Sequence, residues 1–204
     1  MIELPRLYAI LDVSRFPSPG AMLAAAEQLQ AAGVTLLQYR NKSGHTRQIL
    51  EQARALKRRV GHSMRLIMND RADLCLAAAF DGLHVGQQDL SPEGARRVIG
   101  PKLWLGVSTH SPEQLREAAA TSADYLAIGP VFPTESKQNP DPPVGLDGAR
   151  RARELTEKPL VAIGGITRDN ARSVMEAGAD SVAVISDLVH EPRKSAEEFF
   201  HRLG

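Results

Sequence analysis

The chain has 204 residues, of which 43% are hydrophobic and 24% are charged. This is the composition of an ordinary globular protein, and it excludes a fibrous repeat or a disordered chain. The formal net charge of +1 excludes a global field for nucleic acid or for an anionic membrane, so any affinity for anions must come from a local cluster.

The length suits one domain with a substantial core, and we expect residues 1–204 to form it. The single cysteine, Cys75, excludes an intramolecular disulfide, is typical of a reducing cytosol and lies in an apolar run that favours a buried side chain. Residues 1–6 lack the pattern of a secretory leader, and no stretch has the length of a membrane span. We therefore expect a cytoplasmic protein without membrane or nucleic-acid partners. A homo-oligomer is compatible with the sequence, but the outer helices show no apolar excess from which to derive one.

Short apolar runs rich in Val, Ile and Leu alternate with longer segments of helical period, which indicates βα units on a parallel sheet. Eight runs are strand candidates: 7–13, 35–40, 65–69, 82–86, 104–109, 125–131, 159–164 and 181–186. Amphipathic segments lie between them, among them 21–32, 46–60, 112–120 and 168–177. Cap signals mark three helix starts, at Ser91, at Ser111 and at Thr167 with Asp169. Glycines mark two helix ends, at Gly33 and Gly178.

Eight βα units favour a closed barrel, because closure leaves no exposed sheet edge. The main alternative is an open doubly wound sheet, which would place a G-x-G-x-x-G turn after the first strand, and residues 12–20 contain none. We therefore predict an α/β fold, a single (β/α)8 TIM barrel. The connection 133–145 carries four prolines, and a long loop after the sixth strand is typical of a lid or a binding loop.

The carboxyl ends of the strands are where barrels of this kind carry their active sites. The second strand ends with Gln38, Tyr39, Arg40, Asn41 and Lys42. The two-residue period puts Gln38, Arg40 and Lys42 on one inward face and directs Tyr39 at the helices. An amide and two cations on one face suit a multiply charged phosphate. Solvated loop charges at Arg40 and Lys42 are the alternative, and this segment alone does not decide between them.

Two carboxylates follow the next two strands, Asp70 after the third and Asp89 after the fourth. At an effective dielectric of about 20, two such charges about 4 Å apart repel by about 4 kcal/mol, so a cation or a raised pKa is needed. Oxygen ligands favour Mg²⁺ over zinc. Each Asp taken singly could equally be a helix cap or a turn residue, but their placement on neighbouring strand ends favours a shared metal. His84, in the middle of the fourth strand, is expected to be a satisfied core histidine.

The remaining strands also end in polar or small residues. Ser108 ends the fifth strand, and His110 stands directly before Ser111, which indicates an exposed loop or helix-start histidine rather than a general base. Thr134, Ser136 and Lys137 add two hydroxyls and a third cation after the sixth strand. Glycines after the seventh strand and Ser186 after the eighth suit a phosphate bound by backbone N–H groups. A tight strand-to-helix turn explains the glycines equally well.

Taken together, these segments resemble the thiamine-phosphate synthase family over essentially the whole chain. Six family motifs are present: Q-x-R-x-K at 38–42, N-D at 69–70, H-V-G-Q-x-D at 84–89, G-V-S at 106–108, G-P-x-F-x-T-x-[ST]-K at 129–137 and I-G-G-I at 163–166. Asn41 and Gln88 stand where acidic residues are frequent in the family, and Ser136 stands where Thr is frequent.

The resemblance implies a transferase of thiamine biosynthesis that acts on two small phosphorylated substrates. It would join 4-amino-2-methyl-5-(diphosphooxymethyl)pyrimidine to 4-methyl-5-(2-phosphoethyl)thiazole, or to its 2-carboxy form, by dissociative loss of diphosphate, and so form thiamine phosphate. One Mg²⁺ per active site would lie on Asp70 and Asp89. The implied residues for the pyrimidine diphosphate are Gln38, Tyr39, Arg40, Asn41, Lys42, Asn69, Ser108 and Lys137, of which Arg40, Ser108 and Lys137 would be catalytic. Those for the thiazole phosphate are Thr134, Glu135, Ser136, Gly165, Ile185 and Ser186.

Two alternatives stay open on the same fold. The first is a thiazole tautomerase, but those relatives carry a catalytic histidine in the G-P position, where this chain has Pro130. The second is a non-catalytic relative that binds phosphate ligands, and the presence of Asp70, Asp89 and Lys137 argues against it.

Overall fold

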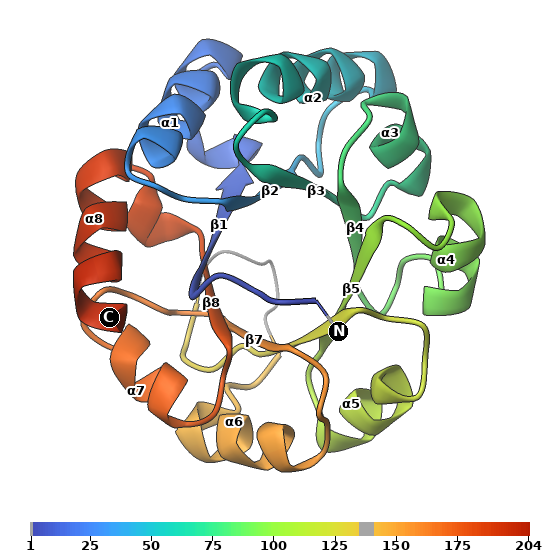
Figure 1. Cartoon of the computed structure of the whole chain (residues 1–204), viewed down its shortest axis with the longest axis vertical. Coiled ribbons are helices and arrows are strands. Elements are labelled where there is room, and N and C mark those ends of the chain that lie inside the picture. The colour runs from blue at the N-terminus through green and yellow to red at the C-terminus, as the bar shows by residue number, and fades with distance from the viewer. Residues whose placement is uncertain (1, 135–140) are drawn as a thin grey trace.

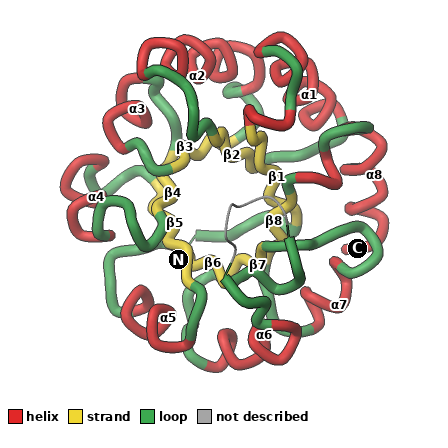
Figure 2. The backbone as a smooth tube through the Cα atoms, turned by 180° about the vertical axis from the view of Figure 1, so that it is seen from behind, coloured by secondary structure: helices red, strands yellow, loops and turns green. Residues whose placement is uncertain are grey.

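The computed structural model describes residues 2–134 and 141–204. Eight parallel strands pair in chain order, and β1 pairs with β8, so the sheet closes on itself. The helices form a ring around this sheet, as Figure 1 and Figure 2 show from opposite sides. The closed barrel confirms the predicted fold and excludes the open doubly wound sheet.

The strands are short, and each is followed by helical structure. They are β1 (Leu7–Asp12), β2 (Leu36–Arg40), β3 (Arg65–Asn69), β4 (Gly82–Val85), β5 (Trp104–Thr109), β6 (Tyr125–Ile128), β7 (Leu160–Ile163) and β8 (Ser181–Val184). The α-helices are α1 (Pro19–Ala31), α2 (Thr46–Val60), α3 (Ala72–Ala77), α4 (Pro92–Ile99), α5 (Pro112–Ala119), α6 (Gly145–Glu154), α7 (Ala171–Glu176) and α8 (Pro192–Leu203). Two 3-10 turns are η1 (Val13–Arg15) and η2 (Ser186–Leu188).

Most predicted boundaries agree with the structure to within one or two residues, and two differences have clear local causes. Strand β6 stops at Ile128, three residues before the predicted end at 131, because Pro130 has no N–H to continue the ladder. Helix α7 begins at Ala171 and not at 168. The side chain of Asn170 accepts the N–H of Thr167 and holds 167–170 as a turn, so the predicted cap at Thr167 with Asp169 is wrong.

The caps predicted at the two serine–proline pairs are confirmed. The hydroxyl of Ser91 accepts the N–H of Gly94 at 3.1 Å, and that of Ser111 accepts the N–H of Gln114 at 3.3 Å. Both bonds satisfy N–H groups that a helix start leaves without a partner. Gly33 and Gly178, with φ of 95° and 101°, occupy the left-handed region directly after helix ends, as expected.

Two apolar layers stabilise the barrel. Alternate strand residues such as Leu37, Leu66 and Leu105 pack outward against the helices, while Ile10, Ile67 and other residues between them fill the barrel interior. Ile2 and Leu4 of the N-terminal segment pack against this interior cluster, and Figure 1 shows that segment crossing the barrel opening. These two residues therefore cover the amino ends of the strands. The polar side chains predicted for the site lie at the opposite, carboxyl ends.

The structure also describes the single cysteine and the character of the helices. Cys75 is buried, as its apolar neighbours indicated, and its thiol lies 3.2 Å from the carbonyl of Gly82. Within residues 2–134 and 141–204, none of the helices combines the length and the apolar character needed to cross a membrane.

Candidate active site

The first polar cluster of the site lies at the carboxyl ends of β1 and β2. Strand register places Asp12 opposite Arg40, and both side chains face the barrel interior. Arg40 forms an ion pair with Asp12, whose side chain is only 3% exposed and also accepts the backbone N–H and hydroxyl of Ser14. Arg40 therefore neutralises a buried carboxylate and is not a solvated loop charge. Its guanidinium has five N–H donors, so it can hold Asp12 and an anion together.

Two of the predicted pyrimidine residues point away from this interior. Tyr39 packs in the layer between the sheet and α2, where its hydroxyl donates to Gln52 at 2.6 Å. The amide of Asn41 also donates to Gln52, and its carbonyl accepts two backbone N–H groups of the following turn. Both side chains thus point away from the barrel interior, and their assignment to the pyrimidine substrate stays a prediction. They support the β2–α2 connection, and their backbone groups remain candidates for contact with a ligand.

The carboxylates of Asp70 and Asp89 lie together, as their strand positions predicted. Burial and then the neighbouring carboxyl of Asp70 raise the pKa of Asp89. Asp89 also accepts the N–H of Gly86 at 2.7 Å, and Lys42 approaches Asp70 to 2.5 Å. Asp70 has a φ of 61°, a left-handed backbone conformation that is uncommon for a residue other than glycine. Asn69, which precedes it, lies two residues after Ile67 in β3 and therefore faces the barrel interior as Ile67 does.

The donor set at this cluster fits Mg²⁺. In proteins Mg²⁺ keeps several waters and is held by one or two carboxylates together with substrate phosphates. Among the described residues, no three His, Cys, Asp or Glu side chains gather in a way that could hold a metal, so two carboxylates with open positions are the available arrangement. In the described part of the rim, three carboxylates, Asp12, Asp70 and Asp89, face the two cations Arg40 and Lys42. A divalent ion would therefore offset the excess of carboxylates in this part of the rim.

Ser108 and His84 form a hydrogen-bonded pair deeper in the site. The Oγ atom of Ser108 lies 2.8 Å from Nε2 of His84, and the histidine is buried in the barrel interior as expected. This pair resembles a nucleophile with its base, which sequence reasoning did not foresee. However, burial lowers the pKa of His84 to about 4, so the imidazole is a weak base at neutral pH. The pair is therefore suited to hydrogen bonding and not to proton abstraction.

His110 lies directly before the cap of α5, as expected, but it is not exposed. Its side chain is 22% exposed, its Nδ1–H donates to the carbonyl of Gly129 at 2.5 Å, and Nε2 lies 3.6 Å from Asp141. Its role in the structure is to tie the end of β5 to the start of the long loop after β6.

The ends of β6, β7 and β8 form the other half of the rim. Gly165 has a φ of 61°, and a Cβ there would meet the carbonyl of Pro133 at 2.5 Å, so this glycine is required by a tight turn. Ile185 is half-buried against the interior cluster, and Ser186 is exposed at the start of η2. Thr134 ends the described part of the loop. Three of the predicted residues, Glu135, Ser136 and Lys137, lie outside the described residues, so the thiazole site and the predicted lid remain predictions.

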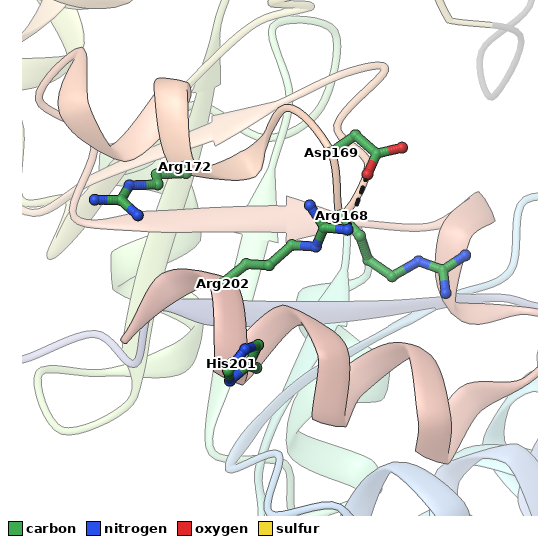
Figure 3. A pocket seen from close by; sticks show the side chains of 5 residues that line it. All are labelled: Arg168, Asp169, Arg172, His201 and Arg202. Atoms are coloured by element: carbon green, nitrogen blue, oxygen red, sulfur yellow. Dashed lines mark ion pairs between the residues drawn. The ribbon is translucent and has the colours of Figure 1, made fainter.

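A separate hollow on the outer helices carries a group of charges but does not form part of this site. It is lined by Arg168, Asp169, Arg172, His201 and Arg202, from α8 and the segment around the start of α7 (Figure 3). Each arginine already has an acidic partner: Asp187 and Glu198 for Arg168, Glu176 for Arg172 and Asp169 for Arg202. The hollow is therefore a paired surface network.

The fold and this rim define the class of protein: a (β/α)8 barrel whose polar residues converge at the carboxyl ends of β1 to β5. The family model described as thiamine monophosphate synthase matches residues 7–188, so the chain belongs to that family. The family inferred from the six motifs is thus confirmed. The expectation of an enzyme, a transferase of thiamine biosynthesis, is confirmed at the level of the family.

Individual relatives agree over nearly the full length. A thiamine-phosphate synthase of Koribacter versatilis is 60% identical over 205 residues, which cover 99% of this chain and 97% of the relative. One of Chloroflexus aurantiacus is 47% identical over 90% of this chain and 85% of the relative. The solved structure of a thiamine phosphate pyrophosphorylase from Pyrococcus furiosus superposes with a TM-score of 0.86 at 36% identity, covering 97% of this chain and 95% of that one.

Sequence reasoning missed several residues that shape the site. Asp12 stands near the end of the first predicted strand, which is the signal that identified Asp70, and it could have been found in the same way. Tyr8 and Tyr125 gave no such signal, because an aromatic residue early in a strand is usually an ordinary core residue. Only the strand register shows that both side chains turn into the barrel interior.

Proposed function

We propose that this chain condenses 4-amino-2-methyl-5-(diphosphooxymethyl)pyrimidine with a phosphorylated 4-methyl-5-hydroxyethylthiazole, and so forms thiamine phosphate and free diphosphate. The observation that carries the proposal is the cluster of Asp70, Asp89, Lys42 and Arg40 on adjacent strand ends. Such a set suits a diphosphate that binds together with a divalent cation. The names of the close relatives support thiamine phosphate as the product, and the identity of the two substrates rests on the sequence resemblance.

The residues of the rim support dissociative loss of diphosphate. Negative charge builds up on the leaving group, so groups fixed beside it stabilise the transition state more than the bound substrate. Arg40 is held in place by the buried Asp12, so its remaining N–H groups are oriented before the substrate arrives. When bound at Asp70 and Asp89, Mg²⁺ would neutralise the charge that develops on the diphosphate. Ser108 would bind the pyrimidine, and no step requires a general base.

Several parts of this proposal rest on the sequence resemblance alone. Lys137 as a third cation, the thiazole phosphate site at Thr134 to Ser136 with Gly165, Ile185 and Ser186, and the carboxylated form of the thiazole belong here. The cytoplasm is the proposed location, and one Mg²⁺ per active site is the proposed cofactor.

The proposed function is tested by incubating the purified protein with both substrates and Mg²⁺ and measuring diphosphate and thiamine phosphate. We expect equal amounts of the two products, and none when either substrate is left out. Asp89→Asn should lose most of this activity, while the matched control Asp147→Asn, on an exposed carboxylate of α6, should keep it. Substrate binding without turnover would show a non-catalytic relative, and rearrangement of the thiazole alone would show a tautomerase.

A further inference from the structure

A continuous chain of five polar side chains crosses the interior of the barrel below the rim. The amide nitrogen of Gln38 donates to the hydroxyl of Tyr8 at 2.8 Å, and that hydroxyl lies 3.0 Å from the hydroxyl of Tyr125. The Tyr125 hydroxyl lies 3.1 Å from Nδ1 of His84, whose Nε2 lies 2.8 Å from the Oγ atom of Ser108. Five different strands, β2, β1, β6, β4 and β5, contribute one residue each. The chain therefore connects Gln38 and Ser108, two residues of the proposed pyrimidine site.

The three central members of this chain are shielded from water. Tyr8 and Tyr125 are 1% and 0% exposed, and His84 is 7% exposed. Within the described residues, every fully buried side-chain nitrogen or oxygen has a hydrogen-bond partner. Buried polar groups of this kind depend on one another, because an unmade hydrogen bond cannot be replaced by one to water. The chain is therefore held in one arrangement by its own members.

Proton counting gives the chain a direction. With the amide nitrogen of Gln38 directed at its hydroxyl, Tyr8 accepts from Gln38, and its one proton is then donated to Tyr125. Tyr125 must then donate to Nδ1 of His84. A neutral imidazole that accepts at Nδ1 carries its proton at Nε2, and that N–H donates to Ser108. The proton of the Ser108 hydroxyl is therefore left to donate to a ligand.

Gly106 provides the space in which this chain is formed. In the strand register it lies between His84 on β4 and Tyr125 on β6. A Cβ at this position would overlap the ring and hydroxyl of Tyr125 and the Nδ1 atom of His84. With no side chain there, the two rings approach to a centroid distance of 5.5 Å above the glycine. The glycine of the G-V-S segment is thus explained by the contact between these two residues.

We propose that Tyr8, Tyr125 and His84 are positioning residues: they hold His84 as the Nε2–H tautomer and so make Ser108 a hydrogen-bond donor to the pyrimidine substrate. The opposite direction of the chain would make Ser108 an acceptor only, because its proton would be used on His84. The direction of the chain is a property of the free protein. Only the identity of the ligand at Ser108 rests on the proposed function.

The direction is tested by nitrogen NMR of the protein labelled in its histidine rings, without substrate. The signal of His84 among the six histidines is assigned by its loss in His84→Gln. We expect a protonated Nε2 and an unprotonated Nδ1 at neutral pH. A protonated Nδ1 in the wild-type protein would overturn the proposal, whatever the enzyme activity.

The consequence for the substrate is tested with Tyr125→Phe, which removes one hydroxyl and keeps the ring. The matched control is Thr109→Val, which removes a buried hydroxyl that donates to the carbonyl of Ala127 at 2.9 Å and lies one residue beyond Ser108. We expect Tyr125→Phe to mix the two tautomers of His84 and to raise the KM for the pyrimidine diphosphate about fivefold, with an unchanged thiazole KM. Thr109→Val should lose similar stability and leave both KM values and the tautomer as in the wild type.

Two outcomes of this second test would overturn the proposal: a single Nε2–H tautomer in Tyr125→Phe, or KM values that change equally in the two variants. A failure of the proposed function gives a different result. In that case the wild-type protein would release no diphosphate from the two substrates, while the tautomer of His84 would still report on the direction of the chain.

Discussion

Gly106→Ala is the most informative single substitution, because its effect on the free energy of unfolding follows from the atoms that surround the added Cβ. The added Cβ would come within 3.0 Å of atoms of both Tyr125 and His84, a separation that real Cβ atoms essentially never show. Overpacking a full core costs about 1–3 kcal/mol, and losing the bond between the two side chains costs about 1 kcal/mol more. We therefore expect a loss of about 3 kcal/mol in the free energy of unfolding. For a chain of this size, that lowers Tm by about 6–12 °C.

The assay is thermal unfolding followed by circular dichroism, with urea unfolding as an independent measure. The control is Gly20→Ala in α1, where the added Cβ meets only the hydroxyl of Ser18 at 3.8 Å. Alanine is favoured over glycine in helices by about 1 kcal/mol, so this control should keep or slightly raise Tm. Gly106→Ala should also disturb the tautomer of His84. If the two variants melt at the same temperature and the tautomer is unchanged, the reasoning about the space above Gly106 is refuted.

Two further predictions follow from buried groups. Arg40→Met leaves the carboxylate of Asp12 buried without its cation. We expect the free energy of unfolding, measured in urea, to fall by about 3–5 kcal/mol. Adding Asp12→Asn to the same chain removes the buried charge and should restore a part of this loss. A loss below about 1 kcal/mol would show that Asp12 does not depend on Arg40. Burial raises the pKa of the Cys75 thiol to about 12, so native protein at about pH 8 should resist iodoacetamide and react only when denatured. Labelling of the native protein at the rate of a free thiol would contradict this.

The fold could be predicted from the sequence because its signal is repeated. Eight short apolar runs separated by helical segments admit few arrangements, and the missing dinucleotide turn removed the main alternative. The errors lie where a single local contact decides the outcome. Strand β6 stops where Pro130 lacks an N–H, and α7 starts late because Asn170 holds the preceding turn. Neither contact is visible in hydrophobic periodicity.

The site could be predicted less completely, for a physical reason. The two-residue period fixed which side of the sheet each residue faces, so Arg40 was placed inward and Tyr39 outward. The resemblance nevertheless assigned Tyr39 and Asn41 to the substrate, and the structure turns both side chains toward α2. The partners across the barrel were missed, because contacts such as Tyr8 with Tyr125 join residues more than a hundred positions apart. Sequence period does not encode which interior residues meet.

The most direct test of the account is a calorimetric titration of inorganic diphosphate into the protein with and without Mg²⁺. The described part of the rim has three carboxylates and two cations, so Mg²⁺ should strongly strengthen the binding of diphosphate. Loss of a residue that only supports a metal ligand weakens metal binding by about tenfold or more. Asp70→Asn and Asp89→Asn, which change the proposed ligands themselves, should each weaken the binding of diphosphate with Mg²⁺ by more than about tenfold. Asp147→Asn should leave it unchanged. Equal binding without Mg²⁺, or undiminished binding in both rim variants, would contradict the shared metal site.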